Sequence, residues 1–236
     1  MRLSVIGCGY LGAVHAAAMA SIGHEVVDER KIEALSRGEA PFFEPGLPEF
    51  LREGVASGRL TFTTDMSAAA GAKVHFVGVG TPQQRDGYAA DLTYVNAAID
   101  ALLPHLRPGD IVAGKSTVPV GTAAGLAPRV AETGATLVWN PEFLREGFAV
   151  KDTIDPDRLV VGLTPGHEEA ADVLREVYAP AVAKGTPFIV TDLATAELVK
   201  VAANAFLATK ISFINAMAEI AEVTGADVTQ LADAIG

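Results

Sequence analysis

The chain has 236 residues, of which 50% are hydrophobic and 20% charged, and its formal net charge is −11. This length suffices for one large domain or two smaller ones with a sizeable buried core. The acidic charge disfavours nucleic acid as a general partner, although a few local donors can still hold a nucleotide. The single cysteine excludes an intrachain disulfide and fits a reducing cytoplasm.

No apolar run approaches the roughly 20 residues that cross a bilayer. The N-terminus lacks the basic and then apolar layout of a signal peptide. We therefore expect a soluble, cytoplasmic protein that binds no membrane.

The first predicted strand, residues 3–6, runs directly into a glycine-rich loop and then a helix over 11–22. The loop has the pattern Gly-x-Gly-x-x-Gly, formed by Gly7, Gly9 and Gly12. In such units the first glycine permits a tight turn, the second lets backbone approach a pyrophosphate, and the third lets the helix pack near the strand. The helix N-terminus then offers free N–H groups to the phosphates. The loop predicts a dinucleotide site; the alternative is a glycine-rich turn without a ligand.

The second predicted strand, residues 25–27, leads into Asp28, about 20 positions after Gly7. An acid at this position binds ribose hydroxyls in dinucleotide folds and favours NAD over NADP, because it repels a 2′-phosphate. The alternative is that Asp28 only caps a helix predicted over 29–36. The strand itself is short for an inner strand of a parallel sheet.

Strands and helices alternate along most of the remaining chain. Further strands are predicted over 60–63, 74–79, 111–113, 135–139, 159–162 and 187–190. Further helices are predicted over 48–56, 93–106, 122–133 and 167–178. This alternation predicts an α/β fold, a Rossmann-like doubly wound parallel sheet with helices on both faces. Ligands of such sheets bind beyond the carboxyl ends of the strands, where residues 78–82 and 114–121 form two further loops.

A long helical pattern over 194–223 follows, without proline or glycine. Gly225 ends it, and Asp227 can cap a short second helix that reaches Ile235. A helix of about 30 residues spans about 45 Å, more than a typical crossover helix. We therefore predict a dinucleotide-binding domain over 1–192 and a long central helical region over 193–236.

The sequence Asn-Pro-Glu-Phe-Leu-Arg-Glu-Gly over 140–147 makes the pattern specific. Supporting motifs occur over 7–12, 41–47, 80–82, 86–87, 90–92, 116–122, 156–158, 204–208, 213–215, 225–228 and 234–236. With these motifs in this order, the chain resembles the nucleotide-sugar dehydrogenases of the UDP-glucose/GDP-mannose dehydrogenase family over essentially its whole length.

The resemblance implies an NAD-dependent enzyme that oxidises the C6 alcohol of UDP-glucose to UDP-glucuronate in two hydride transfers. The segment over 41–47 leans toward UDP-glucose, with a UDP-N-acetylhexosamine or GDP-mannose as the alternative substrate. A non-catalytic NAD-binding or dimerisation module is the alternative of another class.

The resemblance also implies a homodimer formed through the central helix. An apolar stripe at helical spacing supports this and could equally face a core: Ala203, Phe206, Leu207, Ile211, Ile214 and Met217.

The resemblance further implies the site residues, and no metal. The cofactor contacts would be Gly7, Gly9, Tyr10, Leu11, Gly12, Asp28, Lys31, Thr81, Pro82, Thr117 and Glu146. The sugar site would be lined by Glu142, Phe143, Leu144, Lys200 and Asn204. The catalytic set would be Thr117, Glu142, Glu146, Lys200 and Asn204. A cation and an amide donor can stabilise an alkoxide or oxyanion, and a threonine with a glutamate can position water or pass protons.

Several of these residues have plainer interpretations. Glu197 and Lys200 could form a surface ion pair three residues apart on a helix. Glu142 and Glu146, four apart, could be the solvated face of a helix. Cys8, inside the glycine loop, is interpreted as a small buried filler.

Two departures from the family pattern concern function. The family's nucleophilic cysteine lies in a Gly-Gly-x-Cys-x-Pro-Lys-Asp segment that this sequence does not contain. We therefore expect the chain alone not to complete the reaction.

Relatives also carry a longer second strand, so a short segment that includes the ribose-binding acid is expected to be missing between Val27 and Asp28.

Overall fold

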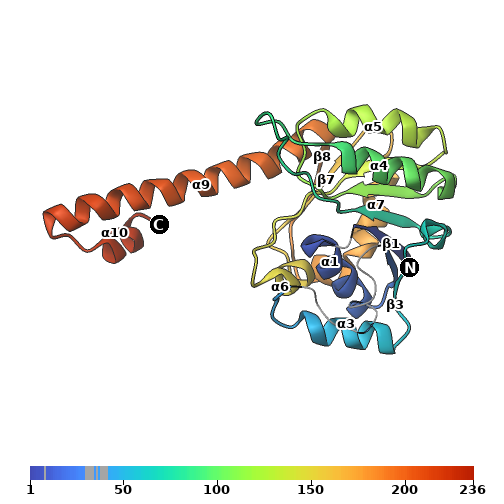
Figure 1. Cartoon of the computed structure of the whole chain (residues 1–236), viewed down its shortest axis with the longest axis horizontal. Coiled ribbons are helices and arrows are strands. Elements are labelled where there is room, and N and C mark those ends of the chain that lie inside the picture. Colours follow the sequence, from blue (N-terminus) through green and yellow to red (C-terminus); the bar gives the residue numbers. More distant parts are fainter. Residues whose placement is uncertain (8, 30–34, 36, 38–41) are drawn as a thin grey trace. The chain divides into compact units, whose positions relative to one another are not determined.

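The computed structural model describes residues 1–7, 9–29, 35, 37 and 42–236. The chain divides into two compact units, Met1–Leu198 and Val199–Gly236 (Figure 1). The first unit is an α/β domain and the second is helical.

The α/β unit is built on one eight-stranded sheet in the order β3-β2-β1-β4-β5-β6-β7-β8. The strands are β1 (Arg2–Ile6), β2 (Glu25–Glu29), β3 (Leu60–Phe62), β4 (Val74–Val77), β5 (Ile111–Gly114), β6 (Thr136–Trp139), β7 (Leu159–Leu163) and β8 (Phe188–Asp192). Strand β1 pairs with both β2 and β4, so the strand order reverses beside it. This reversal is the topological switch point at which doubly wound sheets bind ligands. The predicted Rossmann-like α/β fold is confirmed.

One strand pair departs from the predicted parallel sheet. Strands β1 to β6 run parallel to their neighbours, but β7 pairs antiparallel with β6 through Trp139 and Gly162. Strand β8 is again parallel to β7. An antiparallel pair needs no long crossover helix. The connection from β6 to β7 therefore consists of a loop and one short helix, α6 (Ala149–Ile154).

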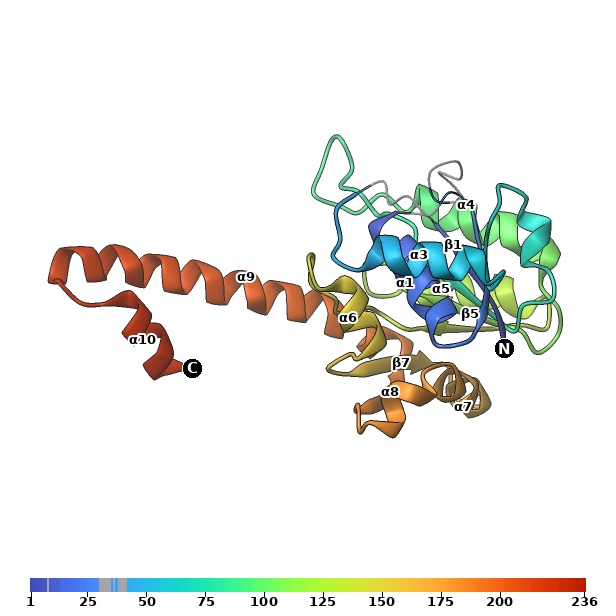
Figure 2. The same ribbon diagram turned by 90° about the horizontal axis from the view of Figure 1, so that it is seen from below.

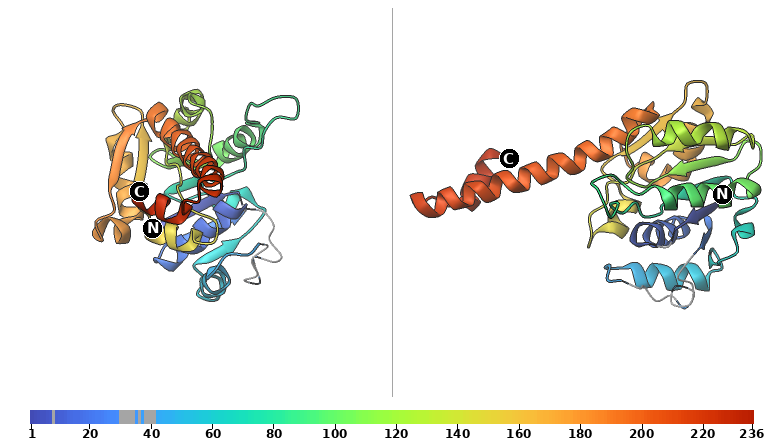
Figure 3. Two further views of the ribbon diagram at one scale, coloured as in Figure 1. Left: turned by 90° about the vertical axis from the view of Figure 1, so that its left-hand side faces the viewer. Right: turned by 45° about the horizontal axis from the view of Figure 1, so that its top comes forward.

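Helices cover both faces of the sheet. Helices α1 (Tyr10–Ser21), α3 (Leu47–Ala56), α6 and α7 (Glu168–Val177) share one face, where α1 contacts α3 and α6 and joins α7 in the core. Figure 2 looks onto this face. Helices α4 (Thr93–Leu102) and α5 (Thr122–Ala131) share the other face, where Arg129 hydrogen-bonds Asn96 at 3.1 Å. The right-hand view of Figure 3 shows the strands between the two sets.

Short helical segments were not predicted from the sequence. They are α6, α8 (Ala179–Ala183) and the 3-10 turn η1 (Met66–Ala69), while a second turn, η2 (Leu103–His105), ends the predicted 93–106 helix. Segments of this length are too short to show a helical period.

Strand β2 is longer than predicted. It continues without a break through Val27 and Asp28 and ends at Glu29, in register with β1. Glu29 therefore belongs to the strand and not to the predicted 29–36 helix. The rest of that helix lies mainly outside the described residues.

The helical unit contains most of α9 (Leu193–Thr224) and all of α10 (Val228–Ile235). Gly225, with φ of +76°, follows the end of α9. The predicted cap of α10 is present, since the Asp227 carboxylate accepts the amides of Thr229 and Gln230 at 2.8 and 3.2 Å. By length and composition alone, α9 is apolar enough to cross a membrane, contrary to our expectation that no segment is. A single such helix is weak evidence, because helices of soluble proteins meet the same criterion.

Candidate functional site

The glycine loop is a tight connection between β1 and α1. Gly7 has φ of +114°, a backbone conformation that residues other than glycine rarely adopt. A Cβ on Gly12 would lie only 1.6 Å from the carbonyl oxygen of Gly7. The backbone of the loop itself therefore requires the first and third glycines. Cys8 lies outside the described residues.

Gly9 has a different role, because its backbone angles are ordinary. It is the N-cap of α1 with φ of −69° and ψ of −172°, and it provides no side-chain cap. A Cβ added there would meet nothing within 4 Å. The N-terminus of α1 therefore borders open space at the switch point, which is the place where a helix can bind a phosphate.

Two acidic residues occupy the end of β2. Asp28 pairs with Val5, whereas Glu29 pairs with Ile6, the last residue of β1. Glu29 is thus the residue that ends β2 beside the glycine loop, and the sequence analysis did not single it out. Its position directly after Asp28 was the available signal. Lys31 lies outside the described residues.

Hydroxyl groups hold together the loops that follow β4 and β5. The Thr81 hydroxyl donates to the carbonyl oxygen of Thr117 at 2.7 Å. The Ser116 hydroxyl donates to the carbonyl oxygen of Val79 at 2.7 Å. The structure therefore brings Thr81 and Thr117 together at the carboxyl edge of the sheet, with Pro82 exposed beside them.

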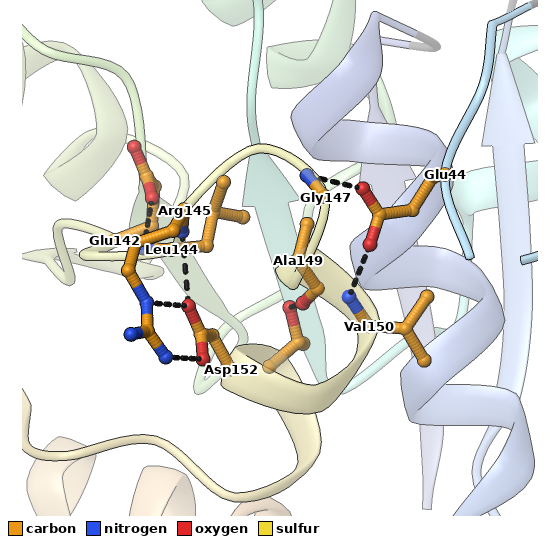
Figure 4. Close-up of polar contacts among 9 residues, drawn as sticks. Glu44, Glu142, Leu144, Arg145, Gly147, Ala149, Val150 and Asp152 are labelled. Carbon is orange, nitrogen blue, oxygen red and sulfur yellow. Dashed lines mark hydrogen bonds and ion pairs between the residues drawn. The ribbon is translucent and has the colours of Figure 1, made fainter. Parts of the chain in front are cut away.

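Residues 140–148 form an irregular loop between β6 and α6, so Glu142 and Glu146 do not share a helix face. The Glu142 carboxylate accepts the amide of Leu144 at 2.7 Å, which folds the loop back on itself (Figure 4). Arg145 donates to Asp152 through Nε and a terminal nitrogen at 2.9 and 2.8 Å. The hydrogen bonds from Arg145 lower the pKa of the Asp152 carboxyl. This ion pair ties the loop to α6.

A buried polar cluster lies beneath this loop. The Lys115 ammonium donates to the backbone and side-chain oxygens of Asn140 at 3.3 and 3.2 Å and to the Tyr178 hydroxyl at 3.3 Å. Tyr178 donates to the side-chain oxygen of Asn140 at 2.7 Å. The His15 ring lies 4.4 Å from the ring of Phe76, and burial lowers the pKa of His15 well below its usual value, with the charge of Lys115 adding to this. Sequence reasoning missed this cluster, because its members lie far apart along the chain and only the fold brings them together.

One pocket joins these parts. Its lining includes Leu11 from α1, Lys115 and the three residues Glu142, Phe143 and Leu144. It therefore unites a predicted cofactor contact with three predicted sugar contacts within the first unit. The Arg158 guanidinium, 4.2 Å from the centre of the Phe143 ring, lies in the same lining.

Glu44 is a further group that sequence reasoning did not assign. Its side chain is 2% exposed, yet it carries a carboxylate. Its oxygens accept the amides of Gly147 at 2.9 Å and Val150 at 3.4 Å (Figure 4), and the Tyr10 hydroxyl. The motif over 41–47 pointed to this segment without indicating a role for the acid.

Glu197 is not a partner in a surface ion pair. Its side chain is 1% exposed, and its two oxygens accept the amides of Gly121 and Ala123, each at 2.7 Å. The plainer interpretation of this residue is therefore wrong. Lys200 and Asn204 follow one turn apart in the second unit, on α9. No group of three or more residues suited to a metal ion is found in the described part of the chain.

Comparison with known proteins identifies related sequences. A model described as the UDP-glucose/GDP-mannose dehydrogenase family, NAD binding domain, matches residues 1–182, and the central domain of that family matches 194–236. The UDP-glucose 6-dehydrogenase of Rhizobium meliloti (strain 1021) is 45% identical, over 100% of this chain and 56% of the relative. The UDP-glucose 6-dehydrogenase TuaD of Bacillus subtilis (strain 168) is 44% identical, over 100% of this chain and 52% of the relative.

The chain spans about half the length of these curated relatives. Both alignments extend over 245 positions, so the relatives carry residues that these 236 do not.

Solved structures agree with this family. A UDP-glucose dehydrogenase from Pyrobaculum islandicum is 42% identical with a TM-score of 0.90, over 100% of this chain and 56% of that one. A GDP-mannose dehydrogenase from Pseudomonas aeruginosa, solved as a ternary complex, is 32% identical with a TM-score of 0.92, over 100% and 56%. The chain therefore belongs to the UDP-glucose/GDP-mannose dehydrogenase family, whose cofactor is NAD, and carries that family's NAD-binding domain and a central-domain segment.

Proposed function

We propose that this chain is the NAD-binding and central part of an enzyme that oxidises the C6 alcohol of UDP-glucose to UDP-glucuronate. The balanced reaction is R–CH2OH + 2 NAD⁺ + H2O → R–COO⁻ + 2 NADH + 3 H⁺. The observation that carries the proposal is the 45% identity over the whole chain to an enzyme named UDP-glucose 6-dehydrogenase.

The residues at the glycine loop fit the cofactor. Gly9 leaves open space at the uncapped N-terminus of α1, and Gly7 and Gly12 permit the loop that creates it. Backbone N–H groups at a helix N-terminus bind a pyrophosphate. NAD⁺ held at this loop would supply the hydride acceptor for oxidation of the alcohol carbon. Acidic residues at the end of β2 favour NAD over NADP. We therefore assign cofactor binding to the loop, to Asp28 and Lys31, and to Thr81, Pro82, Thr117 and Glu146.

The proposed roles of the reactive side chains follow from charge development. Oxidation of an alcohol generates negative charge on oxygen, which a cation and an amide donor stabilise. We assign this role to Lys200 and Asn204. Thr117 and Glu146 would position the water of the second oxidation or pass its proton. Glu142, with Phe143 and Leu144, would hold the sugar.

Calorimetry with the 236-residue chain tests the proposal. NAD⁺ is titrated first, followed by UDP-glucose, with GDP-mannose in a parallel experiment. We expect a heat of binding for NAD⁺ and a second one for UDP-glucose. Absence of NAD⁺ binding would contradict the cofactor assignment. A response to GDP-mannose alone would move the substrate to the alternative that the Pseudomonas structure favours.

A response to NAD⁺ without any response to a nucleotide sugar would favour the second candidate function, a non-catalytic NAD-binding or dimerisation module. The only cysteine, Cys8, lies in the glycine loop rather than in the family's cysteine motif. We therefore expect these 236 residues to give no turnover with UDP-glucose and NAD⁺. NADH formation followed at 340 nm would overturn that expectation.

We further propose a cytoplasmic homodimer that pairs through the central helix. The supporting observation is the exposure of apolar side chains on α9, of which Phe206 is 67% and Leu207 57% exposed. Exposed apolar patches of this kind mark interaction surfaces. Light scattering should show association that increases with protein concentration, and a monomer at all concentrations would exclude the dimer.

A further inference from the structure

Glu44 is a buried carboxylate at the junction of three segments. It lies within residues 42–46, directly before α3, whereas Gly147 lies near the end of the 140–148 loop and Val150 lies in the first turn of α6. Tyr10, which supplies the hydroxyl, is the first residue of α1. Along the chain, Tyr10 is 34 positions from Glu44 and Gly147 is 103 positions from it.

The contacts form a closed set. The amide of Gly147 donates to Glu44 at 2.9 Å and to the Tyr10 hydroxyl oxygen at 3.2 Å. The Tyr10 hydroxyl donates in turn to the same carboxylate oxygen. Burial, followed by the hydrogen bond to Glu44, raises the pKa of Tyr10 to about 12. The hydroxyl therefore remains a donor at neutral pH.

The position of this set links two parts of the candidate site. Tyr10 directly follows Gly9, whose backbone borders the proposed phosphate space. Gly147 directly follows Glu146 and lies in the same loop as Glu142. A displacement of Gly147 therefore moves Glu146, and both ends of the connection lie at residues proposed to contact NAD.

We propose that Glu44 is a positioning residue that fixes the loop carrying Glu142 and Glu146 against the glycine loop, and thereby sets the affinity for NAD. It acts through the Gly147 and Val150 amides and the Tyr10 hydroxyl and itself contacts no substrate. The part of this inference that concerns NAD rests on the proposed function.

The substitution Glu44→Gln separates position from bulk. Glutamine has nearly the same shape but places an NH2 group where one carboxylate oxygen stood. That group cannot accept a hydrogen bond, so it faces the amide of Gly147 or Val150 as a second donor. Asp110→Asn is the matched control. Asp110 is also a buried carboxylate, which accepts the amide of Arg107 at 2.8 Å, but it precedes β5 at the opposite edge of the sheet.

Amide hydrogen exchange of the 236-residue chain measures the positioning directly. In Glu44→Gln we expect exchange to rise about 10-fold at the one amide, Gly147 or Val150, that faces the new NH2 group, with β1 and β4 amides unchanged, since a lost bond to a charged group weakens protection by that factor. Asp110→Asn should leave both amides as in the wild type. Tyr10→Phe, a milder variant that retains both carboxylate–amide bonds, should raise exchange at Gly147 alone by about 3-fold. Unchanged protection of Gly147 and Val150 in Glu44→Gln would overturn the proposal.

NADH fluorescence titration then tests the connection to the cofactor. We expect Glu44→Gln to weaken NADH binding about 10-fold and Asp110→Asn to leave it unchanged. Faster exchange at Gly147 with wild-type NADH affinity would refute the connection. A wild-type chain that binds no NADH would contradict the proposed function instead, and the exchange data would still decide whether Glu44 positions the loop.

Discussion

Glu197 accepts the backbone amide of Gly121 at 2.7 Å and thereby caps a helix from 76 positions away in the sequence. Gly121 is the N-cap of α5 and has no side chain to perform this function. The second oxygen of Glu197 accepts the amide of Ala123, also at 2.7 Å. A carboxylate at a helix N-terminus satisfies free amides and interacts favourably with the helix dipole. The cap also fixes the end of the loop that contains Thr117.

Replacement of Glu197 by glutamine should destabilise the protein. One of the two amides would then face an NH2 group, so the free energy of unfolding should fall by about 1–3 kcal/mol. Urea unfolding followed by circular dichroism measures this change. Glu176→Gln, an exposed substitution on α7, is the control and should change stability by less than about 0.5 kcal/mol. Equal stability of the two variants would show that Glu197 is not a significant cap.

Alanine substitutions of the glycine loop should separate folding from cofactor binding. Gly12→Ala forces a Cβ into the carbonyl of Gly7, so it should unfold the domain or lower its melting temperature strongly. Gly9→Ala meets no neighbouring atom, so it should fold normally. Its methyl group would instead occupy the proposed phosphate space and weaken NADH binding at least about 10-fold. Thermal unfolding and NADH titration of both variants check this, and tight NADH binding by Gly9→Ala would place the phosphates elsewhere.

The elements that the sequence predicted correctly are those that neighbouring residues in the sequence determine. Apolar runs such as Leu159–Leu163 are buried on both sheet faces, and their composition alone identifies them as strands. The glycine loop and the Asp227 cap are likewise defined by neighbouring residues. Strand direction is not a local property, so the antiparallel pairing of Trp139 with Gly162 could not be read from the sequence.

The polar groups that the sequence did not reveal depend on distant partners. Glu44 lies between aromatic and proline residues, and its amide donors follow more than 100 positions later. In the sequence, Glu197 resembles an ordinary polar residue on the surface of a helix. It is a buried cap only because the N-terminus of α5 packs against it. The same holds for Lys115, whose oxygen partners come from β6 and α7 segments. Resemblance to a family located the segments, whereas the chemistry of these three side chains required the fold.

Lys115 and Tyr178 should act as one unit. Lys115→Met removes the donor to both oxygens of Asn140, and Tyr178→Phe removes the 2.7 Å bond to its side chain. Each single variant should lose about 1–3 kcal/mol of stability, because each loses buried hydrogen bonds that include the one from the Lys115 ammonium to the Tyr178 hydroxyl. The double variant should lose less than the sum by at least about 0.5 kcal/mol, because the 3.3 Å bond from Lys115 to Tyr178 is lost in either single variant and is therefore counted twice in the sum. Urea unfolding of the four proteins completes the cycle, and strict additivity would show that the two contacts are independent.

The buried ring of His15 should make stability depend on pH. The side chain is 1% exposed, and its Nε2 atom has no hydrogen-bond partner among the described residues. Burial lowers the pKa of His15 in the folded protein, and the neighbouring charges of Lys115 and His24 lower it further. In the unfolded chain the pKa is about 6.5. Above that value the imidazole is neutral in both states, whereas below it only the unfolded chain gains the proton.

Stability is therefore lost as the pH falls below about 6.5, and between pH 7 and pH 5 this group alone should remove up to about 2 kcal/mol, the limit for a ring that stays unprotonated in the folded protein. His15→Met retains an apolar side chain of similar volume and has no group to protonate. The difference in the free energy of unfolding between pH 7 and pH 5 should thus be smaller in His15→Met than in the wild type, by up to about 2 kcal/mol. Urea unfolding at both pH values measures it. His75 and the carboxylates are present in both proteins. A wild-type slope in His15→Met would therefore show that the protonation of His15 does not differ between the folded and unfolded chain, and that the acid sensitivity arises from those other groups.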